Sequence, residues 1–314
     1  MELRYGILST SSIAPRFIAA VRECSKGSIV ALSSRTLEKA REKAELWDIP
    51  TFYGSHEDLL QDENVNIVYI SNVNTQHYPW AKAALLAGKH VICEKPCTTT
   101  EDMTRELYQL AKKQGLFFME AQKMLFLPAV LAAKEQLPAL GTIQSIEMSH
   151  SFPATYNGWM FDESAGGGPL LSSGIYAVEL VYWLFGKISQ IGGTADLLPT
   201  GVEYQYTLTG KTQSGVTFTA QNSTREVLEN TCRIIGEKGS IELPNYWKAN
   251  KLIFRIGENT EILEYPCRYE LMYEAEHIAQ CLEKGLLTSP VVTEDISLAG
   301  IRAIQQAKAN WNTK

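Results

Sequence analysis

The chain has 314 residues, of which 45% are hydrophobic and 20% are charged, and its formal net charge is −6. This length predicts two domains rather than a single core. The acidic balance disfavours a general affinity for nucleic acid or anionic lipid, and the sequence has no uninterrupted apolar run of membrane-spanning length, so we expect neither a nucleic-acid nor a membrane partner.

The N-terminal segment and the cysteines indicate the cellular compartment. The segment from Met1 to Leu8 has no cationic stretch followed by a long apolar one, so it does not resemble a secretory signal. The six cysteines form no C-x-x-C pair, and we expect reduced thiols, no metal and a cytoplasmic protein. Four histidines share no metal-ligand spacing and are interpreted as structural or surface residues: His56, His90, His150 and His277.

Short apolar runs alternate with helical patterns in the first third of the chain. Strands are predicted at residues 5–8, 28–32, 66–70, 90–93 and 116–119, and helices at 12–24, 37–46, 78–86 and 100–113. Gly88 and Gly115 follow two of these helices, where a left-handed C-cap favours glycine. The alternation predicts βαβ units, so residues 1–121 should form a dinucleotide-binding Rossmann domain with a doubly wound parallel sheet.

The pattern changes after residue 122. Period-2 or β-branched segments predict strands at residues 142–151, 189–197, 203–209, 215–222, 231–235 and 252–256, and helices are predicted at 272–284 and 293–310. We therefore expect residues 122–314 to form an α+β substrate-binding and oligomerisation domain with a largely antiparallel open sheet. Whether the C-terminal helix packs back on the first domain is left open.

The first strand runs into a serine-rich turn. Ser9, Ser11 and Ala14 stand where a dinucleotide-binding chain has G-x-G-x-x-(G/A), so both leading glycines are replaced. The hydroxyl groups can bind phosphate beside the helix N-terminus, but the same cluster is equally typical of a simple helix cap. On the first interpretation, the cofactor contacts are Ser9, Thr10, Ser11, Ser12 and Ile13.

The end of the second predicted strand bears on cofactor choice. It carries Ser34 and Arg35 and no carboxylate, because the first acid, Glu38, lies inside the following helix. A carboxylate at this point favours the ribose of NAD, whereas a cation favours the 2′-phosphate of NADP. We therefore favour NADP over NAD and place Ser34 and Arg35 at the cofactor. The alternative is an exposed arginine at a helix start.

The segment from Ala87 to Pro96 reads A-G-K-H-V-I-C-E-K-P. It closely resembles the A-G-K-H-V-x-x-E-K-P signature of the Gfo/Idh/MocA oxidoreductase family. Residues 72–77 resemble the family's T-P-N-x-x-H loop, residues 118–121 its M-E-A strand, and residues 167–176 its G-G-A-L-L-D-x-G-x-Y segment. Within the family, the pattern is nearest to the dimeric dihydrodiol dehydrogenases and the NADP-dependent xylose dehydrogenases.

The resemblance implies site residues. It places Asn72, Asn74, His77, Glu94 and Lys95 at the cofactor, and relatives often have a cis peptide bond between Lys95 and Pro96. For His77, which could approach the nicotinamide or the substrate, a polar residue that opens a helix is an equally typical alternative. It makes Lys95 and Tyr176 catalytic: Tyr176 would carry the proton, and the Lys95 ammonium would favour the phenolate and bind the reacting oxygen. The alternative for Tyr176 is a core tyrosine. The substrate-binding residues implied are Lys95, Trp159, Ser172 and Tyr176.

Three positions depart from the family pattern. Ser172 stands where an aspartate is usual, and Leu125 and Met160 stand where many relatives have arginine. These changes suggest an unusual substrate or a degraded site. We expect an NAD(P)-dependent dehydrogenase or reductase acting on CH–OH groups of a sugar, polyol or diol. The alternative is a cofactor-binding sensor on the same fold. At least a homodimer is expected, formed through an apolar sheet face between about residues 189 and 256.

Overall fold

The computed structural model describes residues 2–313 and forms two compact units. The first contains Met1–Lys123 and Tyr269–Glu294, and the second contains Met124–Arg268 and Asp295–Lys314. The first boundary falls two residues beyond the predicted residue 121. The larger difference is Tyr269–Glu294, which we expected in the second domain. Its helix α8 (Met272–Glu283) buries Ile278 and Ala279 and contacts α1 (Ala14–Cys24), so packing assigns it to the first unit.

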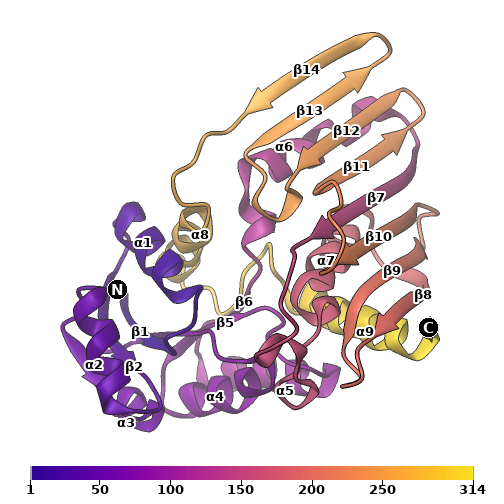
Figure 1. Cartoon of the computed structure of the whole chain (residues 1–314). Coiled ribbons are helices and arrows are strands. Elements are labelled where there is room, and N and C mark those ends of the chain that lie inside the picture. The colour runs from indigo at the N-terminus through magenta and orange to yellow at the C-terminus, as the bar shows by residue number, and fades with distance from the viewer. Residues whose placement is uncertain (1, 314) are drawn as a thin grey trace. The chain divides into compact units, whose positions relative to one another are not determined.

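The first unit contains a six-stranded parallel sheet in the order β3-β2-β1-β4-β5-β6, which confirms the predicted Rossmann topology (Figure 1). The three-residue strand β3 and the six-residue helix α3 were not predicted, because neither is long enough for a clear periodic pattern. The strands are β1 (Arg4–Leu8), β2 (Ser28–Ser33), β3 (Thr51–Tyr53), β4 (Ile67–Ile70), β5 (His90–Glu94) and β6 (Phe118–Ala121). Besides α1 and α8, the helices are α2 (Leu37–Leu46), α3 (His56–Gln61), α4 (Asn74–Leu86) and α5 (Glu101–Gln114).

The second unit contains a nine-stranded sheet in the order β14-β13-β12-β11-β7-β10-β9-β8-β15. Among the described strands of this sheet, only the β7–β10 and β8–β15 pairs are parallel, so the predicted largely antiparallel character is confirmed. The strands are β7 (Ile143–Ser151), β8 (Ile188–Leu197), β9 (Glu203–Thr212), β10 (Thr217–Ser223), β11 (Thr231–Gly236), β12 (Gly239–Pro244), β13 (Lys251–Ile256), β14 (Asn259–Glu264) and β15 (Trp311–Thr313). The helices are α6 (Pro128–Gln136), α7 (Ile175–Phe185) and α9 (Glu294–Asn310).

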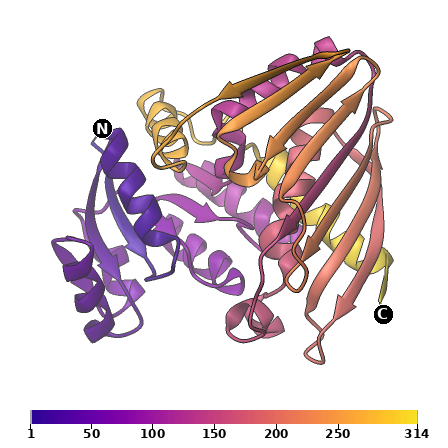
Figure 2. The same ribbon diagram turned by 45° about the horizontal axis from the view of Figure 1, so that its top comes forward.

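The two faces of this second sheet differ. Helices α6, α7 and α9 lie on one face (Figures 1 and 2). An apolar row of paired residues is buried and consists of Leu208, Ala220, Met148, Cys232 and Leu243. The adjacent row points to the other face, is half-buried or exposed, and consists of Thr209, Thr219, Glu147, Arg233 and Glu242. This outward row is polar, in contrast to the apolar oligomerisation face that we predicted.

One helical stretch of the described residues, Glu163–Phe185, is long and apolar enough to cross a membrane by length and composition. Its most apolar window is 72% buried inside the protein. Such burial is typical of a core helix, which passes the same test of length and composition.

Candidate functional site

The serine-rich turn after β1 holds a backbone conformation that normally requires glycine. Ser9 has a φ angle of 135°, in the region that L-residues rarely adopt. Its hydroxyl oxygen accepts a hydrogen bond from the backbone N–H of Ser11 at 3.1 Å, which helps to hold this conformation. The Ser11 hydroxyl in turn donates to that of Ser71, after β4, at 2.8 Å. The turn therefore keeps the glycine-type geometry although both glycines are replaced.

Helix capping distinguishes the two interpretations of this turn. Helices α2, α3 and α5 begin with a side-chain cap from Thr36, Ser55 and Thr100, respectively. Helices α1 and α4 have Ile13 and Val73 at their N-cap positions, and neither helix has a side-chain cap. These two helices follow the adjacent strands β1 and β4, where the strand order reverses and dinucleotides bind. Their uncapped N-termini fit an anionic pyrophosphate and favour the phosphate-turn interpretation over the simple cap.

The edge beyond β2 carries the residues expected at the adenosine. Ser34 is buried and donates its backbone N–H to the carbonyl of Tyr53, whereas Arg35 is exposed. His56 was interpreted as a structural or surface residue, and the structure places it in the interior beside this edge. Its Nδ1 lies 2.8 Å from the Ser33 hydroxyl, and its Nε2 lies 3.3 Å from the Asn72 amide nitrogen. Burial lowers the pKa of His56, so the ring is neutral at pH 7 and links the ends of β2 and β4.

His77, which the motif places at the cofactor, has main-chain groups near both of its ring nitrogens. Its side chain is buried, with Nδ1 2.8 Å from the carbonyl oxygen of Pro96 and Nε2 2.9 Å from that of Asn72. Burial lowers the pKa of His77, while the two carbonyl groups and Glu94 act in the opposite direction. Both ring nitrogens are thus directed at main-chain oxygens, and the residue joins two loops instead of presenting a polar atom to the cofactor. Asn74, also expected at the cofactor, is buried at the start of α4.

Lys95 lies immediately after β5, at the carboxyl edge where ligands of such sheets bind. The expected cis Lys95–Pro96 peptide bond is present. The adjacent Glu94 carboxylate accepts a hydrogen bond from the Tyr69 hydroxyl at 2.6 Å and one from the Lys95 backbone N–H at 3.3 Å. The Tyr69 ring stacks on Phe17 of α1, with centroids 3.8 Å apart. Glu94 therefore contacts the protein itself and fixes the backbone that carries Lys95.

A charged cluster at the same edge was missed by the sequence reasoning. Lys123 follows β6, is buried, and forms an ion pair with Glu270 at 3.0 Å. Arg16 of α1 pairs with the same Glu270 oxygen. Glu274, one turn further along, is completely buried, and burial raises its pKa well above the ordinary value. The signal in the sequence was that three of the four residues after the strand predicted at 116–119 are polar, namely Glu120, Gln122 and Lys123.

The second unit holds the remaining predicted residues. Tyr176 is buried in the first turn of α7, and Trp159 is exposed in a short 3₁₀ helix. Ser172, expected at the substrate, lies in the π-helical turn before α7 and donates its hydroxyl to the carbonyl oxygen of Gly168 at 3.0 Å. That hydroxyl therefore stabilises the turn before Tyr176.

A buried glutamate that the sequence reasoning did not identify also supports this turn. The Glu203 carboxylate accepts a hydrogen bond from the backbone N–H of Leu170 at 2.8 Å. Gly168 has a φ angle of 119°, and a Cβ there would lie 2.3 Å from that carboxylate. Gly168 is therefore required by both its backbone conformation and the close approach of Glu203. Burial raises the pKa of Glu203, while nearby Lys308 lowers it.

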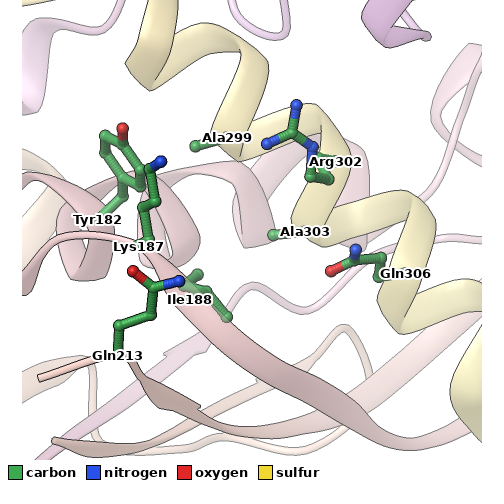
Figure 3. Close-up of a pocket in the computed structure, with 8 residues that line it drawn as sticks. All are labelled: Tyr182, Lys187, Ile188, Gln213, Ala299, Arg302, Ala303 and Gln306. Carbon is green, nitrogen blue, oxygen red and sulfur yellow. The ribbon is translucent and has the colours of Figure 1, made fainter. Parts of the chain in front are cut away.

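A separate pocket of about 180 Å³ lies in the second unit, where α9 faces the end of α7 and the start of β8 (Figure 3). Its polar groups come from Tyr182, Lys187, Gln213, Arg302 and Gln306, with an apolar floor of alanine and isoleucine. None of the predicted site residues lines it. We therefore assign it no part in the chemistry.

The cysteines are free thiols, and four of the six are buried. Burial raises the pKa of Cys281 to about 11, so that thiol is protonated at neutral pH. Among residues 2–313, no group of three or more histidine, cysteine or acidic side chains is arranged to hold a metal ion.

Two family models match the chain. Residues 3–122 match the oxidoreductase family with an NAD-binding Rossmann fold, and residues 131–242 match the GFO/IDH/MocA C-terminal domain. Together these matches cover more than half of the chain and fall in the two sheets described above.

Curated relatives match over nearly the whole chain. The trans-1,2-dihydrobenzene-1,2-diol dehydrogenase of Mus musculus is 33% identical in an alignment of length 309 that covers 93% of this chain and 92% of that protein. The Homo sapiens protein of the same name is also 33% identical, with the same coverage.

Solved structures share the fold. An aldose-aldose oxidoreductase from Caulobacter crescentus, complexed with glycerol, has a TM-score of 0.88 at 25% identity and 98% coverage of both chains. A 3-ketoreductase from Actinomadura kijaniata, in complex with NADP, has a TM-score of 0.90 at 21% identity and covers 100% of this chain and 99% of its own. The chain therefore belongs to the GFO/IDH/MocA family and is an NAD(P)-dependent oxidoreductase.

Proposed function

We propose that this protein moves a hydride between NADP(H) and a secondary alcohol or carbonyl group of a diol or sugar, with Lys95 and Tyr176 as its catalytic residues. The observation that carries the proposal is the position of Lys95 at the carboxyl edge of β5, on a backbone fixed by Glu94 and Tyr69. Substrate choice follows the curated relatives, which are named as dehydrogenases of a trans-diol.

The proposed reaction divides between the cofactor and the chain. In the oxidation direction, the substrate C–H bond breaks and its electron pair passes with the hydrogen to the nicotinamide. The hydroxyl proton passes to the Tyr176 oxygen, while the Lys95 ammonium stabilises the negative charge that develops on the substrate oxygen. Carbonyl reduction is the reverse. Tyr176 suits this role only as a phenolate, which a neighbouring ammonium favours.

Turnover assays test this proposal against the sensor alternative. Purified protein is incubated with NADP or NAD and a panel of trans-diols, aldoses and polyols, and reduced cofactor is followed by absorbance. We expect NADP-dependent turnover with at least one diol or aldose. Tight NADP binding without turnover on any member of the panel, in either direction, would instead support a cofactor-binding sensor.

Cofactor preference is expected to depend on Arg35. This exposed guanidinium follows the buried Ser34 at the end of β2, and the first acid beyond it, Glu38, lies inside α2. Loss of a charge-assisted contact costs about 1.5–3 kcal/mol, so Arg35→Ala should weaken NADP binding by roughly 10- to 150-fold. Binding of NAD should barely change. Arg41→Ala, in the helix α2 that follows Arg35, serves as the control, and an unchanged dissociation constant for NADP in Arg35→Ala would disprove the assignment.

We also propose that the protein is cytoplasmic and at least a homodimer, formed through the open face of the nine-stranded sheet. No helix of the second unit lies on that face (Figure 2), and its half-buried side chains can pair across a two-fold axis. Light scattering at micromolar concentration should give at least twice the mass of the 35.0 kDa chain. Thr219→Arg, at the centre of the face, should yield monomers, whereas a monomeric wild-type protein would exclude this assembly.

A further inference from the structure

Lys123 lies beside Lys95 at one edge of the first sheet. Strands β5 and β6 are parallel neighbours, and their register pairs Glu94 with Ala121. Lys95 is the next residue after β5, and Lys123 comes two residues after the end of β6. Because parallel strands end at the same edge, the two lysines leave the sheet next to each other at its ligand-binding side.

Lys123 is held by specific contacts. Only 6% of its side chain is exposed, and its Nζ lies 3.0 Å from a carboxylate oxygen of Glu270, two residues before the start of α8. The same oxygen accepts from the Arg16 guanidinium of α1. Glu274 of α8 is completely buried, and neither carboxyl oxygen has a hydrogen-bond partner among the described residues. The partly exposed carboxylate of Glu270 therefore binds both Arg16 and Lys123, whereas the Glu274 side chain is completely buried.

The charged form of Lys123 is destabilised in this environment. Burial, Arg16 and Lys95 together lower the pKa of Lys123 to about 7, although Glu94 and Glu274 act in the opposite direction. Glu274 offers little compensation, because burial and the nearby Glu94 raise its own pKa well above the ordinary value. A methionine would fill the same space without this cost, so packing does not explain a lysine here.

We propose that Lys123 is a positioning residue of the hydride-transfer site, whose ammonium acts beside that of Lys95 to favour a negatively charged reacting oxygen. This inference rests on the role proposed above for Lys95. Two ammonium groups at one edge repel each other, and each lowers the proton affinity of the groups around it. Glu270, which Arg16 also binds, holds Lys123 in place, so the charge of Lys123 acts from a fixed position.

The first experiment measures the coupling of the two lysines without any turnover. Protein labelled with ¹³C-lysine is titrated by NMR, and the Cε resonance of Lys123 is assigned from its loss in Lys123→Met. We expect a midpoint near pH 7 in the wild type. In Lys95→Met the midpoint should rise by about one pH unit, because a like charge has been removed. The same substitution at exposed Lys82, which pairs with Glu106, should leave it unchanged.

The second experiment compares pH profiles of kcat/KM for alcohol oxidation. Lys123→Met should move the acidic limb to higher pH by about one unit, because the reacting oxygen loses a stabilising charge. Lys123→Arg keeps a permanent positive charge. The acidic limb of its kcat/KM profile should therefore lie at the same pH as in the wild type or at a lower pH. The dissociation constant for NADPH should change less than threefold in both variants. A purely structural role predicts instead the same loss at every pH.

Thermal unfolding provides a check that Lys123→Met remains folded. Because the folded pKa lies below that of an unfolded lysine, the lysine is most costly below pH 7, where both states are charged. The variant should therefore have a higher unfolding midpoint than the wild type at pH 6, and the difference should narrow as the pH rises towards 10.

Two outcomes separate this inference from the proposed function. An unchanged Lys123 midpoint in Lys95→Met, or an unmoved acidic limb in Lys123→Met, would overturn the inference alone. Absence of turnover by the wild type on every diol and sugar would overturn the proposed function, and the role of Lys123 with it.

Discussion

Lys95→Met is expected to reduce kcat by roughly 10²–10³-fold, the usual effect of removing one preorganised electrostatic group from a reacting oxygen. Methionine keeps the length and much of the volume of the lysine side chain but carries no charge. NADPH binding should persist, because the phosphate turn after β1 and the uncapped start of α1 are unaffected. Steady-state kinetics and NADPH fluorescence titration measure the two effects separately.

The control for this experiment is Lys82→Met. Lys82 lies in the same unit and pairs with Glu106 at 2.6 Å, but 40% of its side chain and 48% of that of Glu106 are exposed. It should retain wild-type turnover, since exposed ion pairs contribute little. If Lys95→Met turned over as fast as Lys82→Met, Lys95 would have no catalytic role and the proposed mechanism would fail.

Tyr176→Phe should lower turnover by roughly 10²–10⁴-fold, the range that general acid–base catalysis supplies. The ring and its packing in the first turn of α7 remain, so the midpoint of thermal unfolding should change little. If the phenol carries the proton, its loss should also remove from the pH profile of kcat/KM the limb that reports its ionisation.

A second tyrosine of the same helix gives the matched control. Tyr182 is half-buried in α7 and lines the separate pocket of the second unit, away from the predicted site residues. Tyr182→Phe should leave both rate and pH profile unchanged. Equal rates in the two variants would return Tyr176 to its alternative role as a core tyrosine and would require another proton donor.

The sequence by itself determined the family, the two sheet types and the position of Lys95. Apolar runs and glycine C-caps at Gly88 and Gly115 are local signals, and the A-G-K-H-V-x-x-E-K-P string is a contiguous one. Such signals do not depend on distant contacts, which is why the parallel, doubly wound sheet and the cis Lys95–Pro96 bond were expected correctly. The three-residue β3 gave no periodic signal and was missed.

Tertiary structure decided which polar residues meet. His77 was expected at the cofactor from its motif. Its two ring nitrogens are directed at the carbonyl oxygens of Asn72 and Pro96, and the contact with Pro96 joins α4 to the loop after β5. The ion pair between Lys123 and Glu270 joins residues 147 positions apart, and no local pattern encodes it. The assignment of α8 to the first unit likewise depends on packing against α1. Burial and charge pairing depend on these distant neighbours, so only the folded chain reveals the charged cluster beside Lys95.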